Sequence, residues 1–85
     1  MKSFEFVVKD ECGIHARPAG LLANKAKSFV SDIELKKGEN TANMKKLFSL
    51  MSLGVKKNDK VIVNAQGADE DKAIQDIQDF FNKNL

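Results

Sequence analysis

The chain has 85 residues, enough for one domain with a single modest hydrophobic core. Its 42% hydrophobic and 31% charged residues are ordinary for a globular protein and exclude a disordered or low-complexity chain. The net charge of +2 comes from 14 basic and 12 acidic residues mixed along the chain, so we expect protein partners and no nucleic acid.

The chain has one cysteine, which rules out an internal disulfide framework. No segment has the order of a secretion signal or the apolar length that a bilayer-spanning helix needs. We therefore expect a cytoplasmic monomer, a single domain over residues 1–85 that does not insert into a membrane.

The first third of the chain predicts a strand followed by a helix. Apolar residues alternate over residues 4–8, the period of a strand with one buried face, and this strand should end near Lys9. Apolar residues then recur at intervals of three and four, which predicts a helix over about residues 16–29. Its buried stripe is expected to contain Ala19, Leu22, Ala23, Ala26 and Phe29.

The middle of the chain predicts a hairpin and a short helix. Alternation over residues 32–36 followed by Gly38 indicates a strand that turns into a short polar third strand. The apolar run at residues 47–51 predicts a brief helix, which Gly54 is suited to end in the left-handed conformation. Asn43 is a candidate N-cap for this helix.

The last third predicts one more strand and a longer helix. Residues 61–65 alternate as a strand does, and Gly67 follows them. Asp69 is the expected N-cap of a helix that reaches almost to Leu85, because acidic residues suit the positive start of a helix. Its buried face is expected to contain Ala73, Ile74, Ile77, Phe80 and Phe81.

The element order is therefore β-α-β-β-α-β-α. Strands with one polar face favour an antiparallel sheet that is covered by helices on one side only. We predict an α+β fold, an open-faced β-sandwich in which three helices cover one face of a four-stranded antiparallel sheet.

One segment brings together the only histidine, the only arginine and the only proline of the chain, within residues 13–19 (Gly-Ile-His-Ala-Arg-Pro-Ala). Pro18 is tolerated in the first turn of a helix, where its missing N–H would have no partner, so His15 should lie at or beside the N-cap. The free N–H groups and positive dipole end there form an anion site, and Arg17 adds a charged fork suited to phosphate oxygens. A phosphoryl group on His15 would be well held; the alternative is that His15 only caps the helix and Arg17 is a surface charge.

These residues resemble the active-site signature of HPr, the family of histidine-containing phosphocarriers of the bacterial phosphoenolpyruvate:sugar phosphotransferase system. Residues 51–55 (Met-Ser-Leu-Gly-Val) resemble the family's second-helix ending, and residues 65–70 (Ala-Gln-Gly-Ala-Asp-Glu) its last strand-to-helix turn. The resemblance implies that His15 accepts a phosphoryl group on Nδ1 from enzyme I, with phosphoenolpyruvate as the original donor, and passes it to sugar-specific IIA domains. Arg17 and the backbone N–H groups of Ala16 and Arg17 would stabilise the phosphate, in a carrier more than an independent enzyme.

The short second helix is a candidate docking surface. Leu47, Phe48 and Met51 are hard to bury together on so short a helix, and an exposed apolar patch rimmed by charge commonly marks a protein interface. The resemblance supports this, because the family meets enzyme I and IIA domains with this helix. The positive rim would come from lysines: Lys27, Lys45 and Lys46. The alternative is that the apolar residues simply close the core.

The chain departs from the resemblance at Lys46. Many HPr proteins of Gram-positive bacteria have a serine there, which a metabolite-controlled kinase phosphorylates. Lysine has no hydroxyl and is a poor N-cap, so we predict no serine-phosphate control at this position. Ser49 and Ser52 lie nearby, but neither matches the regulatory position.

Cys12 and His15 have C-x-x-H spacing, but a zinc site needs three or four ligands and the chain has no other cysteine or histidine. A Cys-His nucleophile pair would lack a third group to orient the imidazole. We therefore expect no metal and no cofactor. A regulatory relative of the phosphotransferase system, such as a nitrogen-control branch, remains an alternative that fits His15 equally.

Overall fold

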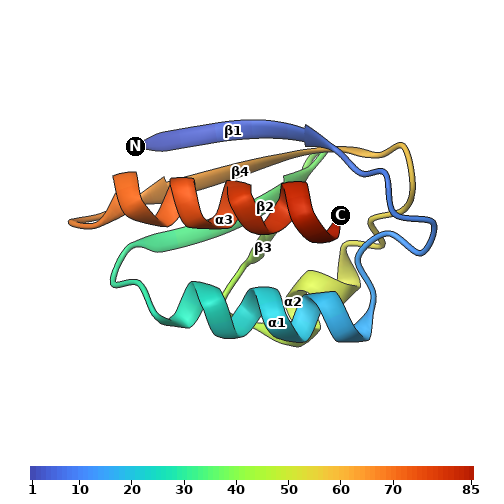
Figure 1. The fold of residues 1–85 in the computed structure, drawn as a ribbon, viewed down its shortest axis with the longest axis horizontal. Helices are drawn as coiled ribbons and strands as arrows, with labels where there is room; N and C mark the ends of the chain where they lie inside the picture. Colours follow the sequence, from blue (N-terminus) through green and yellow to red (C-terminus); the bar gives the residue numbers. More distant parts are fainter.

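The computed structural model describes residues 1–85 and has seven elements in the predicted order. They are β1 (Lys2–Val7), α1 (Ala16–Lys27), β2 (Asp32–Lys37), β3 (Asn40–Asn43), α2 (Leu47–Ser52), β4 (Lys60–Gln66) and α3 (Glu70–Asn84). The strands form one antiparallel sheet in the order β1-β4-β2-β3. All three helices lie on the same side of this sheet (Figure 1), so the predicted open-faced β-sandwich is confirmed. None of the helices has the length and apolar character needed to cross a bilayer.

The buried faces are the ones that the periodicity predicts. In β2 and β4 every second side chain is buried, while Glu34 and Asn64 face outward and share a hydrogen bond of 3.1 Å. Phe81 of α3 is fully buried and packs edge-on against Phe4 and Phe6 of β1, with ring centroids 5.5 and 5.2 Å apart. Such aromatic pairs add to the stabilisation from buried area. This contact fixes α3 across β1.

Two predicted element ends differ by two residues from the structure. β1 ends at Val7 and not near Lys9, because the N–H of Val8 bonds to Asp59 in the turn before β4 and that of Lys9 bonds to Leu85. The first helix ends at Lys27, because the following N–H groups bond three residues back, which tightens the last turn.

The prediction that Asn43 caps the second helix is wrong. The N-cap of α2 is Lys46, whose side chain makes no capping hydrogen bond. Asn43 instead shapes the turn before the helix: its Oδ1 accepts from the N–H of Lys45 and its carbonyl from the N–H of Lys46. Gly54 follows α2 with φ +64°, so its predicted left-handed conformation is confirmed.

Asp69 lies at the predicted N-cap of α3, but its carboxylate does not cap that helix. It accepts hydrogen bonds from the N–H of Val30, the N–H of Ser31 and the hydroxyl of the fully buried Ser31. These bonds join the turn before α3 to the loop between α1 and β2. They lower the pKa of Asp69 below its ordinary value, chiefly through the Ser31 hydroxyl and then through the Val30 N–H.

Candidate functional site

His15 is the N-cap of α1, as predicted. Its backbone is extended, with φ −124° and ψ −175°, and its carbonyl accepts the N–H of Ala19 at 2.9 Å. Its side chain is exposed and makes no capping bond, so the imidazole is open to a partner. Pro18 has no N–H, so Ala16 and Arg17 supply the two first-turn N–H groups that lack an intrahelical partner.

The first turn of α1 contains no acidic residue. A carboxylate there would occupy the positive end of the helix and repel a second anion. The Arg17 side chain is exposed in the same turn and adds a permanent positive charge. The start of α1 is therefore suited to an anion such as a phosphoryl group.

The loop before His15 is pressed against the loop between α2 and β4. Gly13 has φ +65°, and a Cβ on it would clash with the Val55 carbonyl oxygen and lie 2.7 Å from Lys56 Cα. The same carbonyl accepts the N–H of Ile14 at 3.1 Å. Only glycine fits this close approach in a left-handed conformation, so the backbone on either side of His15 is fixed.

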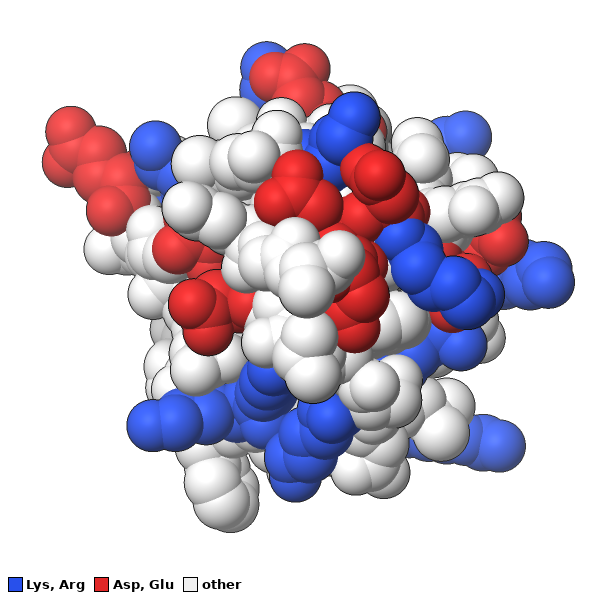
Figure 2. Space-filling view, turned by 90° about the vertical axis from the view of Figure 1, so that its left-hand side faces the viewer, with Lys and Arg blue, Asp and Glu red and all other residues white.

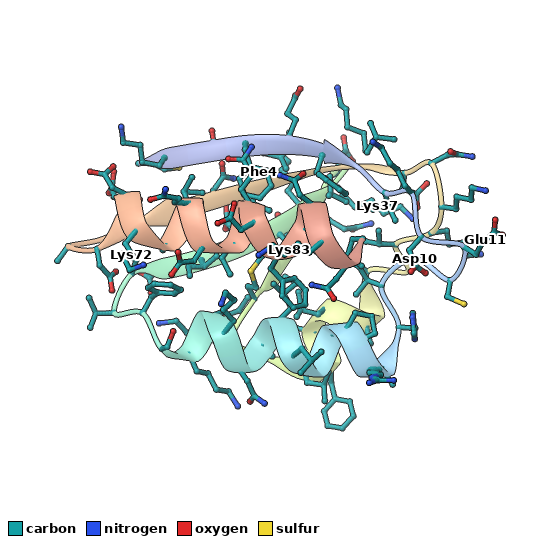
Figure 3. All side chains as sticks on the ribbon, viewed as in Figure 1. Phe4, Asp10, Glu11, Lys37, Lys72 and Lys83 are labelled. Atoms are coloured by element: carbon teal, nitrogen blue, oxygen red, sulfur yellow. The ribbon has the colours of Figure 1, made fainter.

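The loop that supports Gly13 is itself held by charge. Lys37, at the end of β2 and labelled in Figure 3, donates to the Gly54 carbonyl at 2.8 Å and pairs with Asp59 at 2.9 Å. Asp59 also accepts the N–H of Lys56 at 2.8 Å. These contacts lower the pKa of Asp59, first through the Lys37 hydrogen bond and then through the Lys56 N–H.

The predicted apolar docking residues differ in exposure. Phe48 is 81% exposed and Met51 39%, whereas Leu47 is half-buried and packs against the core. Leu21 of α1 is 51% exposed, and α1 packs beside α2. The predicted docking surface, on the short helix alone, does not include Leu21. Its signal in the sequence is an apolar residue that lies off the buried stripe of α1.

The predicted positive rim lies toward the other end of α1. Lys27 is the last residue of α1, about 18 Å along the helix axis from His15. Lys45 is half-buried, and its Nζ donates a hydrogen bond to the Phe29 carbonyl at 2.8 Å. This ammonium group is therefore partly occupied by a contact within the molecule. Lys46 is exposed at the start of α2.

The structure adds a third possible ligand beside Cys12 and His15. Donor atoms of Asp10, Cys12 and His15 all lie within 4.8 Å of one another. The C-x-x-H spacing includes only cysteine and histidine, whereas the third donor is the Asp10 carboxylate, two residues before Cys12. A shallow hollow elsewhere on the surface lies among polar residues of the open sheet face, away from His15. Transfer of a group between proteins requires an exposed acceptor and no deep pocket.

Comparison with known proteins decides the family. Residues 2–83 match the family model described as the phosphotransferase-system HPr component phosphorylation site. The chain belongs to the HPr family. The phosphocarrier protein HPr of Mycoplasma genitalium is 44% identical over 85 residues, 99% of this chain and 97% of that protein. HPr proteins are phosphocarriers of the phosphotransferase system, so the function class expected from the sequence is confirmed.

Two solved HPr structures have the same fold. A Mycoplasma histidine-containing phosphocarrier protein superposes with a TM-score of 0.94 at 33% identity, covering 96% of this chain and 93% of that one. HPr from Thermoanaerobacter tengcongensis superposes with a TM-score of 0.93 at 36% identity, covering 98% and 93% of the two chains. The match includes sheet order and helix placement, so the HPr fold extends over essentially the whole chain.

Proposed function

We propose that His15 of this HPr-family chain accepts a phosphoryl group on Nδ1 from phospho-enzyme I and passes it to IIA domains. The observation that carries the proposal is the exposed His15 imidazole at a helix start with two free N–H groups and no first-turn carboxylate. The lone pair of Nδ1 forms the new N–P bond while the bond from phosphorus to the donor breaks, its electron pair returning to the donor. The second transfer reverses these roles with the IIA acceptor.

The role of the chain in this reaction is to hold charge and geometry. The N–H groups of Ala16 and Arg17 and the Arg17 guanidinium stabilise the three oxygens of the phosphoryl group. The fixed loop on either side of Gly13 holds the His15 backbone at the helix start, so that only the imidazole side chain is ordered when a partner binds. Catalytic groups beyond these come from enzyme I and the IIA domains.

The decisive test is phosphoryl transfer with purified components. The protein is incubated with enzyme I and labelled phosphoenolpyruvate, and a panel of IIA domains is then added. Acid-labile, alkali-stable label should appear on the protein, move to a IIA domain and be absent from His15→Ala. Unlabelled wild-type protein beside an active control carrier would refute the proposal.

The contribution of Arg17 is tested by Arg17→Gln. Loss of a hydrogen bond to a charged group should slow transfer by about tenfold or more. Lys25→Gln removes an exposed charge from the same helix and is the matched control. Equal rates for the two variants would show that Arg17 does not act at the phosphate.

We also propose that this carrier lacks serine-phosphate control. Lys46 occupies the N-cap of α2, where it is exposed and has no hydroxyl. The Ser52 hydroxyl donates to the Phe48 carbonyl within the helix. Incubation of the His15→Ala variant with the metabolite-controlled kinase and labelled ATP should incorporate no phosphate; stable label on a serine would overturn this proposal.

A further inference from the structure

The only cysteine and the only histidine of the chain lie beside a carboxylate. Donor atoms of Asp10, Cys12 and His15 lie within 4.8 Å of one another. Asp10 and Cys12 belong to the loop before α1, and His15 is the N-cap of that helix. Cys12 and His15 are exposed and Asp10 is half-buried, so solvent reaches the cluster. We name these three residues the loop cluster.

The backbone that carries the loop cluster is fixed before any ligand binds. Oδ1 of Asp10 accepts the N–H of Cys12 at 2.8 Å, and the Asp10 carbonyl accepts the N–H of Gly13 at 3.0 Å. The N–H of Asp10 bonds to the Leu85 carbonyl at 2.9 Å, which ties the start of the loop to the end of α3. Figure 3 shows Asp10 inside this bend and Glu11 pointing away from it. A ligand at the cluster would therefore order side chains only.

The three donor types match a borderline metal ion. Thiolate, imidazole and carboxylate are the ligands of Zn²⁺, which takes three protein ligands and a water in open sites. The thiolate disfavours Mg²⁺ and Ca²⁺, which prefer oxygen alone. Tetrahedral coordination at ordinary Zn²⁺ bond lengths separates two donors by about 3.3 to 3.6 Å. The donor atoms of the loop cluster lie within 4.8 Å of one another, so binding requires side-chain rotations that bring them closer.

The charges of the loop cluster balance a divalent cation. A carboxylate and a thiolate supply two negative charges, and the imidazole binds as a neutral ligand. Arg17 and the start of α1 favour an anion at the same place, so a cation there depends on both anionic ligands. Loss of either ligand should therefore weaken binding strongly.

We propose that Asp10, Cys12 and His15 bind one Zn²⁺-class ion and that the bound ion prevents phosphorylation of His15. The binding stands on the loop cluster alone, whereas the inhibition rests on the proposed function. The ion and the phosphoryl donor compete for the same imidazole and for the space in front of α1. Zinc would thus act as a reversible block on the carrier.

Binding is tested by calorimetric titration of the reduced full-length protein with Zn²⁺, and by Co²⁺ titration with the thiolate-to-metal absorption as readout. Wild-type protein should bind one ion, and Cys12→Ser, Asp10→Asn and His15→Ala should each lose at least about tenfold in affinity. Glu11→Gln removes a charge from the same loop, where Glu11 pairs with Lys57, and should bind as wild type does. Absence of binding, or equal affinity in wild type and Cys12→Ser, would overturn the site.

Inhibition is tested by the initial rate of His15 phosphorylation against free Zn²⁺, each variant normalised to its own metal-free rate. Wild type should lose activity at the concentration where it binds the ion, and Cys12→Ser should need at least about tenfold more. Identical inhibition curves would assign the effect to enzyme I and overturn the block. The titrations need no phosphoryl transfer, so a failure of the proposed function remains distinguishable from a failure of the metal site.

Discussion

The backbone position of His15 and the free N–H groups beside it are set by neighbouring residues. Pro18 fixes the first turn of α1 and leaves two N–H groups free, and the absence of a first-turn carboxylate leaves that end available to an anion. Gly13 allows the preceding loop to approach the Val55 carbonyl. The backbone position of His15 is thus set by residues that carry no reactive group themselves.

Gly13→Ala should destabilise the protein by about 2 kcal/mol or more, because the new Cβ meets backbone atoms in a left-handed conformation. Gly20→Ala is the control: nothing lies within 4 Å of a Cβ there, and alanine in a helix interior should add about 0.5 to 1 kcal/mol. Urea unfolding measures both. A Gly13→Ala variant as stable as wild type would contradict the close approach.

At the scale of elements, two carboxylates fasten parts of the fold that are distant in the chain. Asp69 joins the start of α3 to the loop after α1, and Lys37 with Asp59 joins the end of β2 to the loop after α2. Both carboxylates accept backbone N–H groups, which favours their charged form. These two contacts are therefore sensitive to acid.

The lowered pKa of Asp69 predicts acid sensitivity. The unfolded chain binds a proton near the ordinary value of 3.8, whereas the folded protein holds Asp69 ionised to lower pH. The unfolding free energy should therefore fall from about pH 5 downward, and the contribution of Asp69 is lost as pH passes its folded pKa. Asp69→Asn should flatten this fall and Ser31→Ala should flatten it partly, as urea unfolding at a series of pH values would show. An unchanged slope in Asp69→Asn would contradict the assignment.

At the scale of the whole molecule, the start of α1 lies opposite an end where carboxylates gather. Figure 2 views the end where α3 begins, opposite the start of α1, and carboxylates gather across its middle with lysines below them. The exposed apolar residues Leu21, Phe48 and Met51 belong to α1 and α2, which pack together. A partner that docks on these helices meets an apolar surface and the start of α1 together.

Phe48→Ala should raise the KM for enzyme I or a IIA domain about five- to thirtyfold, the loss of a typical aromatic interface anchor. Its stability should change little, because the side chain is 81% exposed. Val30→Ala is the matched control, since Val30 is 76% exposed in the loop after α1, and it should alter neither value. Steady-state transfer kinetics and urea unfolding measure the two effects. Equal KM values for both variants would exclude Phe48 from the interface.

Local sequence pattern alone determined the strands, the helices, their order and the N-cap position of His15, because periodicity, Pro18 and the glycines act over a few residues. The end of β1 and the partners of Asp69 depended on hydrogen bonds to residues that are distant in the chain. The end of α1 and the role of Asn43 rest on bonds to residues two or three positions away, which periodicity does not reveal. The exposure of Leu21 and of Phe48 on two helices that pack together required tertiary packing, and the approach of Asp10 to Cys12 and His15 required the conformation of the folded loop. Sequence spacing says which residue types are present, but only the folded loops decide which side chains share one surface.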